Sequence, residues 1–325
     1  MKFATLPDGS RDGWLVMVSK DLKAAVSVGK PAKTMQQALE SWDEIEGELQ
    51  ALYEALNTGR AAGSFNFDQK GALAPLPRAY QWLDASAFLS HGALMQKALG
   101  LESNPQTEAI PLMYQGASDD FLGPCAPAPF TSEDDGIDFE GEFGVVLADV
   151  PMGVSPEAGE RAIRLLVQVN DWSLRSLARR EMASGFGFLQ AKPSTAFAPV
   201  AVTPDELGDA WRNGRINLPL EVVWNGQVFG RPEAGQMDFR FGDLISHAAR
   251  SRRLRAGTIL GSGTVSNADA EQVGSACISE RRALDAIAGR APTAFMKFGD
   301  RVQMESRDPE GHPIFGPINQ VVVQA

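Results

Sequence analysis

The sequence contains only two cysteines, Cys125 and Cys277, among its 325 residues. Secreted domains held together by disulfides need several cysteine pairs, so this class is excluded and a reducing compartment, the cytoplasm, is expected. Long hydrophobic runs are also missing, and a membrane-spanning helix needs ~20 apolar residues in succession. The opening segment lacks the apolar stretch of a signal peptide, which again favours the cytoplasm.

Positive charge is scarce as well. The sequence has 30 Lys and Arg residues against 41 Asp and Glu, so its formal net charge is −11. Because nucleic-acid binding depends on concentrated positive charge, we expect no nucleic-acid partner. The one basic run, at 250–255, is interpreted as the C-terminal end of a helix, where positive charge is favourable. Hydrophobic residues make up 44% of the chain and charged residues 22%, which excludes a disordered protein.

Residues 1–76 are predicted to form a small β-rich domain. Apolar runs at 14–18 and 24–28 are separated by polar turns, which is typical of short strands. A helix is expected to follow, because Thr34 begins a capping-box pattern, and to stop at Gly59.

Residues 77–325 are predicted to form a second, larger domain that is rich in strands with helices inserted. Asp84 is interpreted as the N-cap of a helix that runs to Leu99. The Asn-Gly pair at 225–226 predicts a hairpin between two strands. Further strands are expected at 138–147, 258–260, 294–298, 301–305 and 320–323.

Two glutamates separated by one glycine are the first candidates for chemistry. If this segment is a strand, Glu140 and Glu142 point to the same face. Two carboxylates this close repel each other unless a proton or a cation lies between them. The alternative is an ordinary strand surface that faces solvent.

An acidic residue after an apolar run is the second candidate. Asp171 stands where the buried strand expected at 163–169 meets a helix, a rigid position that suits a functional site. Its alternative role is that of a helix N-cap. Further along, a glycine-rich segment leads to Lys192, which taken alone would be a surface residue.

Taken in order, these segments resemble the fumarylacetoacetate hydrolase family. The resemblance rests on Glu140-Gly-Glu142, the segment 170–175, Lys192 and the Gly-Ser-Gly-Thr segment 261–264. Each motif is weak alone, but four of them in the family's order are specific. The resemblance implies an α+β fold in which a β-rich roll of mixed sheets surrounds the site. It also implies a homodimer, and residues 1–76 fit the small extra domain of the longer members.

The resemblance further implies a metal site. In the family, four carboxylates hold a Mg²⁺ or Ca²⁺ ion, and the residues that match them here are Asp84, Glu140, Glu142 and Asp171. Oxygen ligands suit such a hard cation, and Mn²⁺ also fits, whereas zinc would favour His and Cys.

The remaining family positions concern catalysis. The family's catalytic histidine lies seven residues after the first aspartate and matches His91, a suitable base near neutral pH, although a lone histidine is more often structural. Lys192 would supply a fixed positive charge beside an oxygen that becomes negative. The glutamate that orients the histidine is assigned to Glu280 on an expected strand, although counting without a gap gives Ile278.

The pocket is less well matched than the metal site. Residues that match substrate-contacting positions of the family are Tyr114, Arg175 and Thr264. The sequence departs from the animal-type members at Ser86, Ala178, Met182 and Ala196. These departures leave the predicted metal ligands and base in place but alter the pocket.

The leading hypothesis is a metal-dependent hydrolase that cleaves the carbon–carbon bond of a β-diketo acid. The resemblance makes 4-fumarylacetoacetate, an intermediate of tyrosine and homogentisate breakdown, the leading substrate. The alternatives within the superfamily are an acylpyruvate or fumarylpyruvate hydrolase and an oxaloacetate decarboxylase. A protein that binds a metal and a small acid without turnover is the third hypothesis, and such a protein would not need His91. The expected partners are therefore a small diketo acid and a second copy of the chain, with no membrane.

Overall fold

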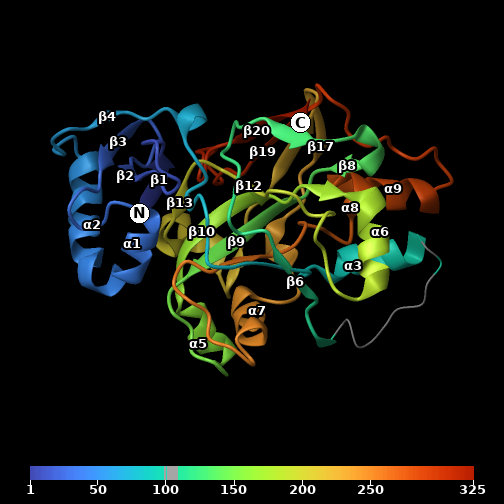
Figure 1. Cartoon of the computed structure of the whole chain (residues 1–325), viewed down its shortest axis with the longest axis horizontal. Coiled ribbons are helices and arrows are strands. Elements are labelled where there is room, and N and C mark those ends of the chain that lie inside the picture. The colour runs from blue at the N-terminus through green and yellow to red at the C-terminus, as the bar shows by residue number, and fades with distance from the viewer. Residues whose placement is uncertain (99, 101–108) are drawn as a thin grey trace.

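The computed structural model describes residues 1–98, 100 and 109–325. Its centre is an 11-stranded sheet that runs from β4 at one end to β6 at the other (Figure 1). Strands β18 and β5 are parallel whereas β18 and β9 are antiparallel, so the sheet is mixed. In sheet order the strands are β4 (Phe65–Asn66), β3 (Ala24–Ser27), β2 (Trp14–Val18), β1 (Lys2–Leu6), β13 (Ala201–Val202), β10 (Ile163–Asn170), β9 (Gly141–Leu147), β18 (Ile259–Gly261), β5 (Trp82–Ala85) and β6 (Met113–Gly116), with β12 (Ala196–Phe197) paired to β10.

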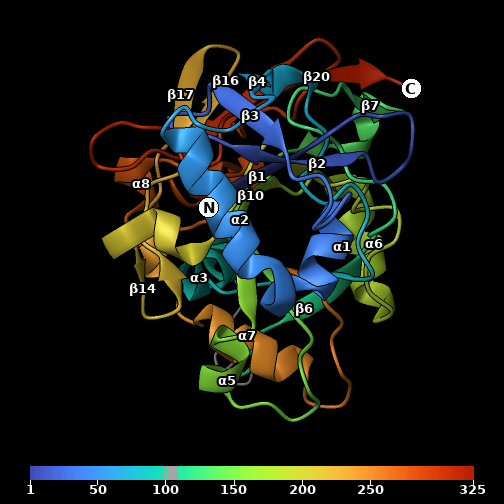
Figure 2. The same cartoon turned by 90° about the vertical axis from the view of Figure 1, so that its left-hand side faces the viewer.

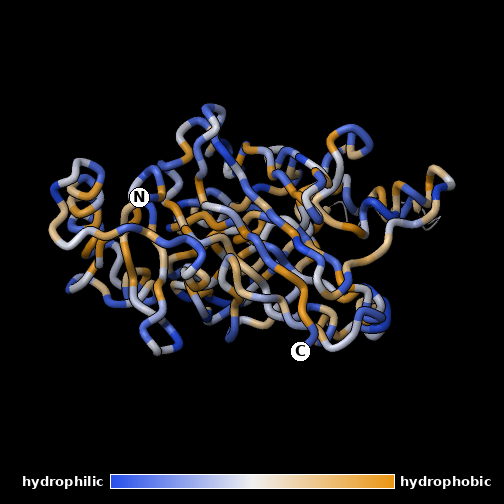
Figure 3. The backbone as a smooth tube through the Cα atoms, turned by 90° about the horizontal axis from the view of Figure 1, so that it is seen from above, coloured by the Kyte–Doolittle hydropathy of each residue, from blue (hydrophilic) through white to orange (hydrophobic). Residues whose placement is uncertain are grey.

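A second sheet has five strands, and two short ribbons accompany it. The five strands in sheet order are β17 (Gln227–Gly230), β16 (Glu221–Trp224), β19 (Arg301–Glu305), β20 (Ile318–Gln324) and β7 (Ala128–Phe130). The ribbons pair β8 (Ile137–Asp138) with β11 (Ser173–Leu174), and β14 (Trp211–Arg212) with β15 (Arg215–Ile216). Figure 3 shows apolar segments along the crossing strands at the centre of the molecule, as expected for a buried core.

Helices lie at both ends of the molecule and along one side between them (Figure 1). The α-helices are α1 (Met35–Glu40), α2 (Trp42–Asn57), α3 (Leu89–Ala98), α5 (Pro156–Glu160), α6 (Arg175–Ser184), α7 (Phe241–Ala248), α8 (Ala270–Val273) and α9 (Ile278–Ile287). Short 3₁₀ turns are η1 (Gln69–Gly71), η2 (Glu133–Asp135), η3 (Pro204–Ala210) and η4 (Ala234–Gln236). No helix within the described ranges combines the length and apolarity needed to cross a membrane. The predicted α+β fold with mixed sheets is confirmed.

The N-terminal strands belong to the same sheet as the larger part of the chain. β1 pairs with β2 on one side and with β13 on the other, and β13 pairs with β10. Helices α1 and α2 pack at this end of the molecule (Figure 2). Phe3 of β1 and Leu49 of α2 are buried in one apolar cluster with Val167 of β10. The two parts of the chain therefore share a hydrophobic core.

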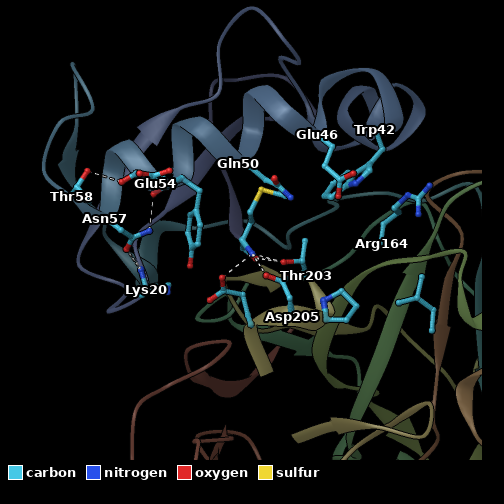
Figure 4. A pocket seen from close by; sticks show the side chains of 15 residues that line it. Lys20, Trp42, Glu46, Gln50, Glu54, Asn57, Thr58, Arg164, Thr203 and Asp205 are labelled. Atoms are coloured by element: carbon cyan, nitrogen blue, oxygen red, sulfur yellow. Dashed lines mark hydrogen bonds and ion pairs between the residues drawn. The ribbon is translucent and has the colours of Figure 1, made fainter. Parts of the chain in front are cut away.

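A cavity of about 510 Å³ lies where α2 meets the segment 203–206 (Figure 4). The α-ammonium group of Met1 donates a hydrogen bond to Thr203 and lies 2.9 Å from Glu206 Oε1. Burial, followed by the charge of Glu206, raises the pKa of the Tyr53 hydroxyl on the facing helix. The α-ammonium group of Met1 is thus paired with Glu206. We interpret the cavity as a gap where the N-terminal part of the chain packs against the larger part.

The structure agrees in part with the secondary structure predicted for the N-terminal part. The strands expected at 14–18 and 24–28 are β2 and β3, but β1 and the short β4 were not predicted. Thr34 Oγ1 accepts a hydrogen bond from the Gln37 N–H, as the capping pattern predicts. The single expected helix is nevertheless broken at Ser41, where α1 ends and α2 begins.

The helix start predicted at Asp84 is wrong. Asp84 lies on β5, and the following helix, α3, begins at Leu89. The Leu89 N–H donates to Asp238 Oδ2 at 2.7 Å, so a residue remote in sequence satisfies this helix terminus. The predicted end at Leu99 lies outside the described residues.

Two further expectations need correction. The strand expected at 294–298 is reduced to an isolated bridge between Met296 and Ile137. The basic run at 250–255 follows α7 instead of forming its last turn. The predicted hairpin at 225–226, in contrast, is confirmed by the pairing of β16 with β17.

Candidate functional site

Four acidic side chains meet at one edge of the large sheet. Asp84 comes from β5 and Glu142 from the start of β9. Glu140 directly precedes β9 and forms an isolated bridge with Cys277, and Asp171 follows the last residue of β10. One carboxylate oxygen from each residue lies within 4.8 Å of the others, and all four side chains are buried. The structure therefore brings together the four residues that the sequence pattern proposed as metal ligands.

The Gly-Ser-Gly-Thr segment makes room for Asp84. A Cβ atom on Gly261 would lie 2.4 Å from Asp84 Oδ1, a distance that real side chains do not adopt. The Gly263 N–H donates to the same oxygen at 3.0 Å, and its φ of 76° favours glycine. This motif of the sequence thus positions a carboxylate without offering a side chain of its own to it.

Lys192 lies within this acidic cluster. Its Nζ donates to Glu140 Oε2 and to Asp171 Oδ2, both at 2.5 Å. Burial alone would lower the pKa of Lys192, but Asp171 and Glu140 raise it above its ordinary value. Lys192 is therefore a buried side chain paired with two carboxylates, and not the surface residue considered as its alternative.

The two glutamates differ in electrostatic environment. Burial would raise the pKa of Glu140, but Arg175 and Lys192 hold it below its ordinary value. Burial and then Asp84 raise the pKa of Glu142 well above its ordinary value. Burial, followed by Asp171, raises the pKa of Asp84 to about 8. Glu140 is thus ionised by its cationic neighbours, whereas Asp84 and Glu142 have an unbalanced negative charge when they ionise.

The acidic cluster fits a divalent cation. Both oxygens of Glu142 are buried and have no hydrogen-bond partner among the described residues. An unpaired buried carboxylate is costly, and a cation bound by several oxygens would remove this cost. The absence of His and Cys from the cluster disfavours zinc.

His91 and Glu280 face each other beside this cluster. His91, on α3, has its Nδ1 3.5 Å from Oε1 of Glu280, which is fully buried. The same Glu280 oxygen accepts a hydrogen bond from Ser266 Oγ at 2.5 Å. Glu280 lies in the first turn of α9 and not on the strand that was expected. Counting without a gap gave Ile278, whereas the assignment shifted by two residues gave Glu280. Glu280 is the acid that faces the histidine in the structure.

Asp138 is a site residue that the sequence reasoning missed. Its two carboxylate oxygens accept the N–H groups of Ile278 and Ser279, which begin α9, at 2.7 and 2.9 Å. Arg175 Nε also donates to Asp138, and Arg175 Nη2 donates to Glu140. Asp138 thereby connects the helix that carries Glu280 to the acidic cluster. Asp138 lies two residues before Glu140, at the same spacing as Glu140 and Glu142, so this spacing in the sequence could have identified it.

Two hydroxyl groups complete the surroundings of Asp171. Tyr114 donates to Asp171 Oδ2 at 2.6 Å, and Thr195 donates to Asp171 Oδ1 at 2.8 Å. Ala196, one of the positions where the sequence departs from the animal-type members, cannot supply a hydroxyl group here, whereas the preceding residue, Thr195, does. Asp171 thus belongs to the cluster, and no helix begins directly after it because β11 intervenes.

A cavity of about 440 Å³ gives access to the site. The predicted residues that line it are Asp84, His91, Tyr114, Glu140, Arg175, Lys192 and Thr264. Glu142, Asp171 and Glu280 lie behind these side chains. Of the positions where the sequence departs from animal-type members, Ser86 and Met182 line the cavity, whereas Ala178 is not among its lining residues.

The sequence matches two family descriptions along its length. Residues 81–323 match "Fumarylacetoacetate (FAA) hydrolase C-terminal", and residues 1–78 match "Fumarylacetoacetase N-terminal domain 2". A relative, the 2,4-didehydro-3-deoxy-L-rhamnonate hydrolase of Sphingomonas sp. (strain SKA58), is 28% identical over 167 residues. That match spans 50% of this chain and 56% of the relative.

Solved structures share the fold over the whole chain. Maleylpyruvate hydrolase from Sphingobium sp. SYK-6, in complex with manganese(II) and pyruvate, has a TM-score of 0.66, 15% identity and 100% coverage of both chains. The 5-carboxymethyl-2-hydroxymuconate delta-isomerase from Mycobacterium smegmatis has a TM-score of 0.62 and 17% identity, and covers 100% of this chain and 99% of its own. At these identities the similarity shows the fold alone.

Proposed function

Because the chain belongs to the fumarylacetoacetate hydrolase family, we propose that it is a metal-dependent hydrolase that cleaves the carbon–carbon bond of a β-diketo acid. Members of the family are hydrolases and isomerases, and the chain is an enzyme of this group. The observation that carries the proposal is that one cavity is lined by His91 and by two residues of the acidic cluster, Asp84 and Glu140. Glu280 faces the histidine.

The cluster residues are proposed to hold the cation. Asp84, Glu140, Glu142 and Asp171 would hold Mg²⁺, Ca²⁺ or Mn²⁺, and Mn²⁺ gains support from the maleylpyruvate hydrolase complex. When bound, such an ion polarises a carbonyl group and stabilises negative charge on its oxygen. Lys192 keeps two of the carboxylates ionised and in place for this purpose.

His91 is proposed to be the general base. With Nδ1 turned toward Glu280, its other ring nitrogen is left to accept a proton from water. The resulting hydroxide adds to a carbonyl carbon of the substrate, and the bond from that carbon to the neighbouring CH₂ carbon then breaks. One product leaves as a carboxylic acid, and the other as an enolate that takes the proton back from His91. The sum is one diketo acid plus one water giving an acid and a ketone.

Two substrate groups fit this chemistry. The sequence resemblance favours 4-fumarylacetoacetate, whereas the similarity to maleylpyruvate hydrolase, solved with pyruvate, favours diketo acids that release pyruvate. Both groups contain carboxylate and carbonyl oxygens, which a cation bound by the cluster would attract. The proposal covers either group, since the bond broken is the same.

The decisive experiment follows the ultraviolet absorbance of diketo acids. Purified protein is treated with EDTA and assayed with and without added Mn²⁺ or Mg²⁺, and the products are identified. Metal-dependent loss of the diketone absorbance with stoichiometric acid and ketone products is expected for at least one substrate group. Intact substrates throughout the series would refute hydrolysis, and conversion to an isomer would place the enzyme in the other class of the family.

We also propose that the protein is a homodimer and that it is located in the cytoplasm. Each chain would consist of two domains, residues 1–76 and 77–325. Cys125 and Cys277 are unpaired, as a reducing compartment requires. Light scattering tests the dimer: a mass of twice 34.9 kDa is expected, and a mass of one chain would contradict it.

A further inference from the structure

We infer that the substrate is a monocarboxylic diketo acid whose far end is an uncharged, apolar group and not a second carboxylate. This inference rests on the proposed function and specifies its substrate. It favours acylpyruvates with apolar acyl groups over 4-fumarylacetoacetate, which carries a carboxylate at both ends. Two properties of the 440 Å³ cavity carry it, namely the engagement of its cations and the chemistry of its rim.

The cationic side chains of the cavity are already engaged within the protein. Among the described lining residues, only His91, Arg175 and Lys192 can carry positive charge. Arg175 donates to Asp138 and Glu140, and Lys192 donates to Glu140 and Asp171. His91 faces Glu280. Each cation therefore has a carboxylate partner before any substrate enters.

Neighbouring segments do not supply a replacement. Arg179 and Arg180 follow Arg175 on α6 but are exposed and absent from the cavity lining, and Arg180 donates to Gln190 Oε1 at 2.7 Å. Residues 99 and 101–108 contain no Lys, Arg or His in the sequence. A second carboxylate of a substrate would thus enter a site in which the described residues offer no free cation, beside the acidic residues Asp84 and Glu140.

The rim of the cavity is apolar instead. The large apolar side chains that line the cavity are the buried Phe88 and, toward the opening, Leu112, Met113, Met182 and Phe188. Leu112 is 58% exposed and Met182 is 67% exposed, whereas the acidic residues are buried. The cavity therefore leads from a buried polar end to an open apolar end.

This rim is held in place by hydrogen bonds. Glu181 on α6 accepts the N–H groups of three residues, Leu189, Gln190 and Ala191, at 2.9–3.1 Å. These bonds fix the segment that carries Phe188, whose ring packs edge-on against Tyr114 with centroids 5.2 Å apart. Since the Tyr114 hydroxyl already donates to Asp171, the tyrosine presents its ring rather than a free donor to this part of the cavity.

Burial of an apolar group here is favourable, because such a group leaves water for side chains of its own kind. A carboxylate in the same position loses its hydration without gaining a cation. The two effects act in the same direction, so an apolar end should bind better than a carboxylate end of similar length. The preference is expected to be at least about tenfold in Kd.

A matched pair of ligands tests the inference without turnover. 2-Oxoheptanoate and 2-oxoadipate share the 2-oxo acid group and differ at the far end, and neither has the second carbonyl that cleavage requires. Their Kd values are measured by calorimetry on the Mn²⁺-loaded protein. At least tenfold tighter binding of 2-oxoheptanoate supports the inference. Equal Kd values, tighter binding of 2-oxoadipate or no binding of either ligand would overturn it.

A variant at the rim provides an internal check. Met182→Arg adds a free cation beside the opening, and Met182→Gln changes polarity and keeps a similar length without charge. The ratio of the two Kd values should move at least about tenfold toward 2-oxoadipate in Met182→Arg and less in Met182→Gln. A ratio that is the same in both variants would contradict the assignment of the rim. Failure of the proposed hydrolysis is recognised separately, since no acid and ketone products would then form in the absorbance assay.

Discussion

His91 Nδ1 lies 3.5 Å from Oε1 of Glu280, and the two side chains come from helices α3 and α9, which pack together near the site. A buried carboxylate in this position selects the histidine tautomer and stabilises the charged ring that forms when His91 takes up a proton. Glu280→Gln should therefore lower kcat about 10–100-fold with little change in KM. Partial recovery in Glu280→Asp distinguishes this effect from misfolding, whereas equal loss of kcat and thermal stability in both variants would contradict it.

Metal binding and turnover should be separable by mutation. Asp171→Asn removes a charged oxygen from the cluster and should weaken Mn²⁺ binding by more than about 100-fold, beyond the effect of residues that only orient ligands. His91→Ala should keep the Mn²⁺ affinity and lose about 100–10,000-fold in kcat. Calorimetric titration with Mn²⁺ measures the first and the absorbance assay the second.

Glu48→Gln, on the exposed face of α2, is the matched control for charge removal and should change neither quantity. Unchanged turnover in His91→Ala would remove it as the general base. Unchanged Mn²⁺ affinity in Asp171→Asn would remove that residue from the metal site.

The stabilisation by metal should increase with pH. Burial and Asp171 raise the pKa of Asp84 to about 8 from an ordinary value of 3.8, so the folded, metal-free chain holds this proton more tightly than the unfolded chain. That contribution to stability is fully present below pH 3.8 and is lost as the pH rises through about 8. A bound cation needs the ionised carboxylate, so it should offset the loss.

The rise in Tm on adding Mn²⁺ to EDTA-treated protein should consequently be larger at a pH above 8 than at pH 6. Asp84→Asn should flatten this dependence. A constant gain in Tm across the range would contradict the assignment of Asp84 to the cluster.

Gly263 is expected to tolerate no side chain. A Cβ atom at this position would lie 2.2 Å from the carbonyl oxygen of Ala85, next to Asp84, and the φ of 76° adds strain. Gly263→Ala should therefore displace Asp84 and lower the Mn²⁺ affinity at least about tenfold, as well as the Tm. Gly153→Ala is the control, because Gly153 has a φ of 75° with no atom within 4 Å of the added Cβ. It should cost a similar backbone strain and leave Mn²⁺ affinity unchanged.

The candidates for the acidic cluster could be found because they are local in sequence. Glu140 and Glu142 alternate along an extended segment and Asp171 follows a recognisable buried strand, but these patterns also allowed a solvent-facing strand and a helix N-cap. The family resemblance assigned the three residues to a metal site and added Asp84 and His91. Local patterns of strands and turns predicted a strand-rich chain, and the resemblance supplied the α+β fold with mixed sheets.

The errors arose where distant residues decide the outcome. Asp84 resembles a helix cap, but the start of α3 is satisfied by Asp238, which no local pattern reveals. Asp138 accepts hydrogen bonds from the backbone N–H of Ile278 at the start of α9 and from Arg175. Both partners lie far from Asp138 in sequence, so a local pattern does not reveal them. Arg175 has the charge expected of a residue that binds a substrate carboxylate. In the structure it already donates hydrogen bonds to Asp138 and Glu140.

Strand β1 lies between β2 and β13, so the N-terminal part completes the edge of the catalytic sheet. A chain shortened at residue 76 would leave the backbone groups of β13 unpaired on that side and uncover the apolar surface around Val167. An exposed edge next to exposed apolar residues promotes strand-to-strand aggregation. The N-terminal part therefore protects this edge of the sheet against self-association.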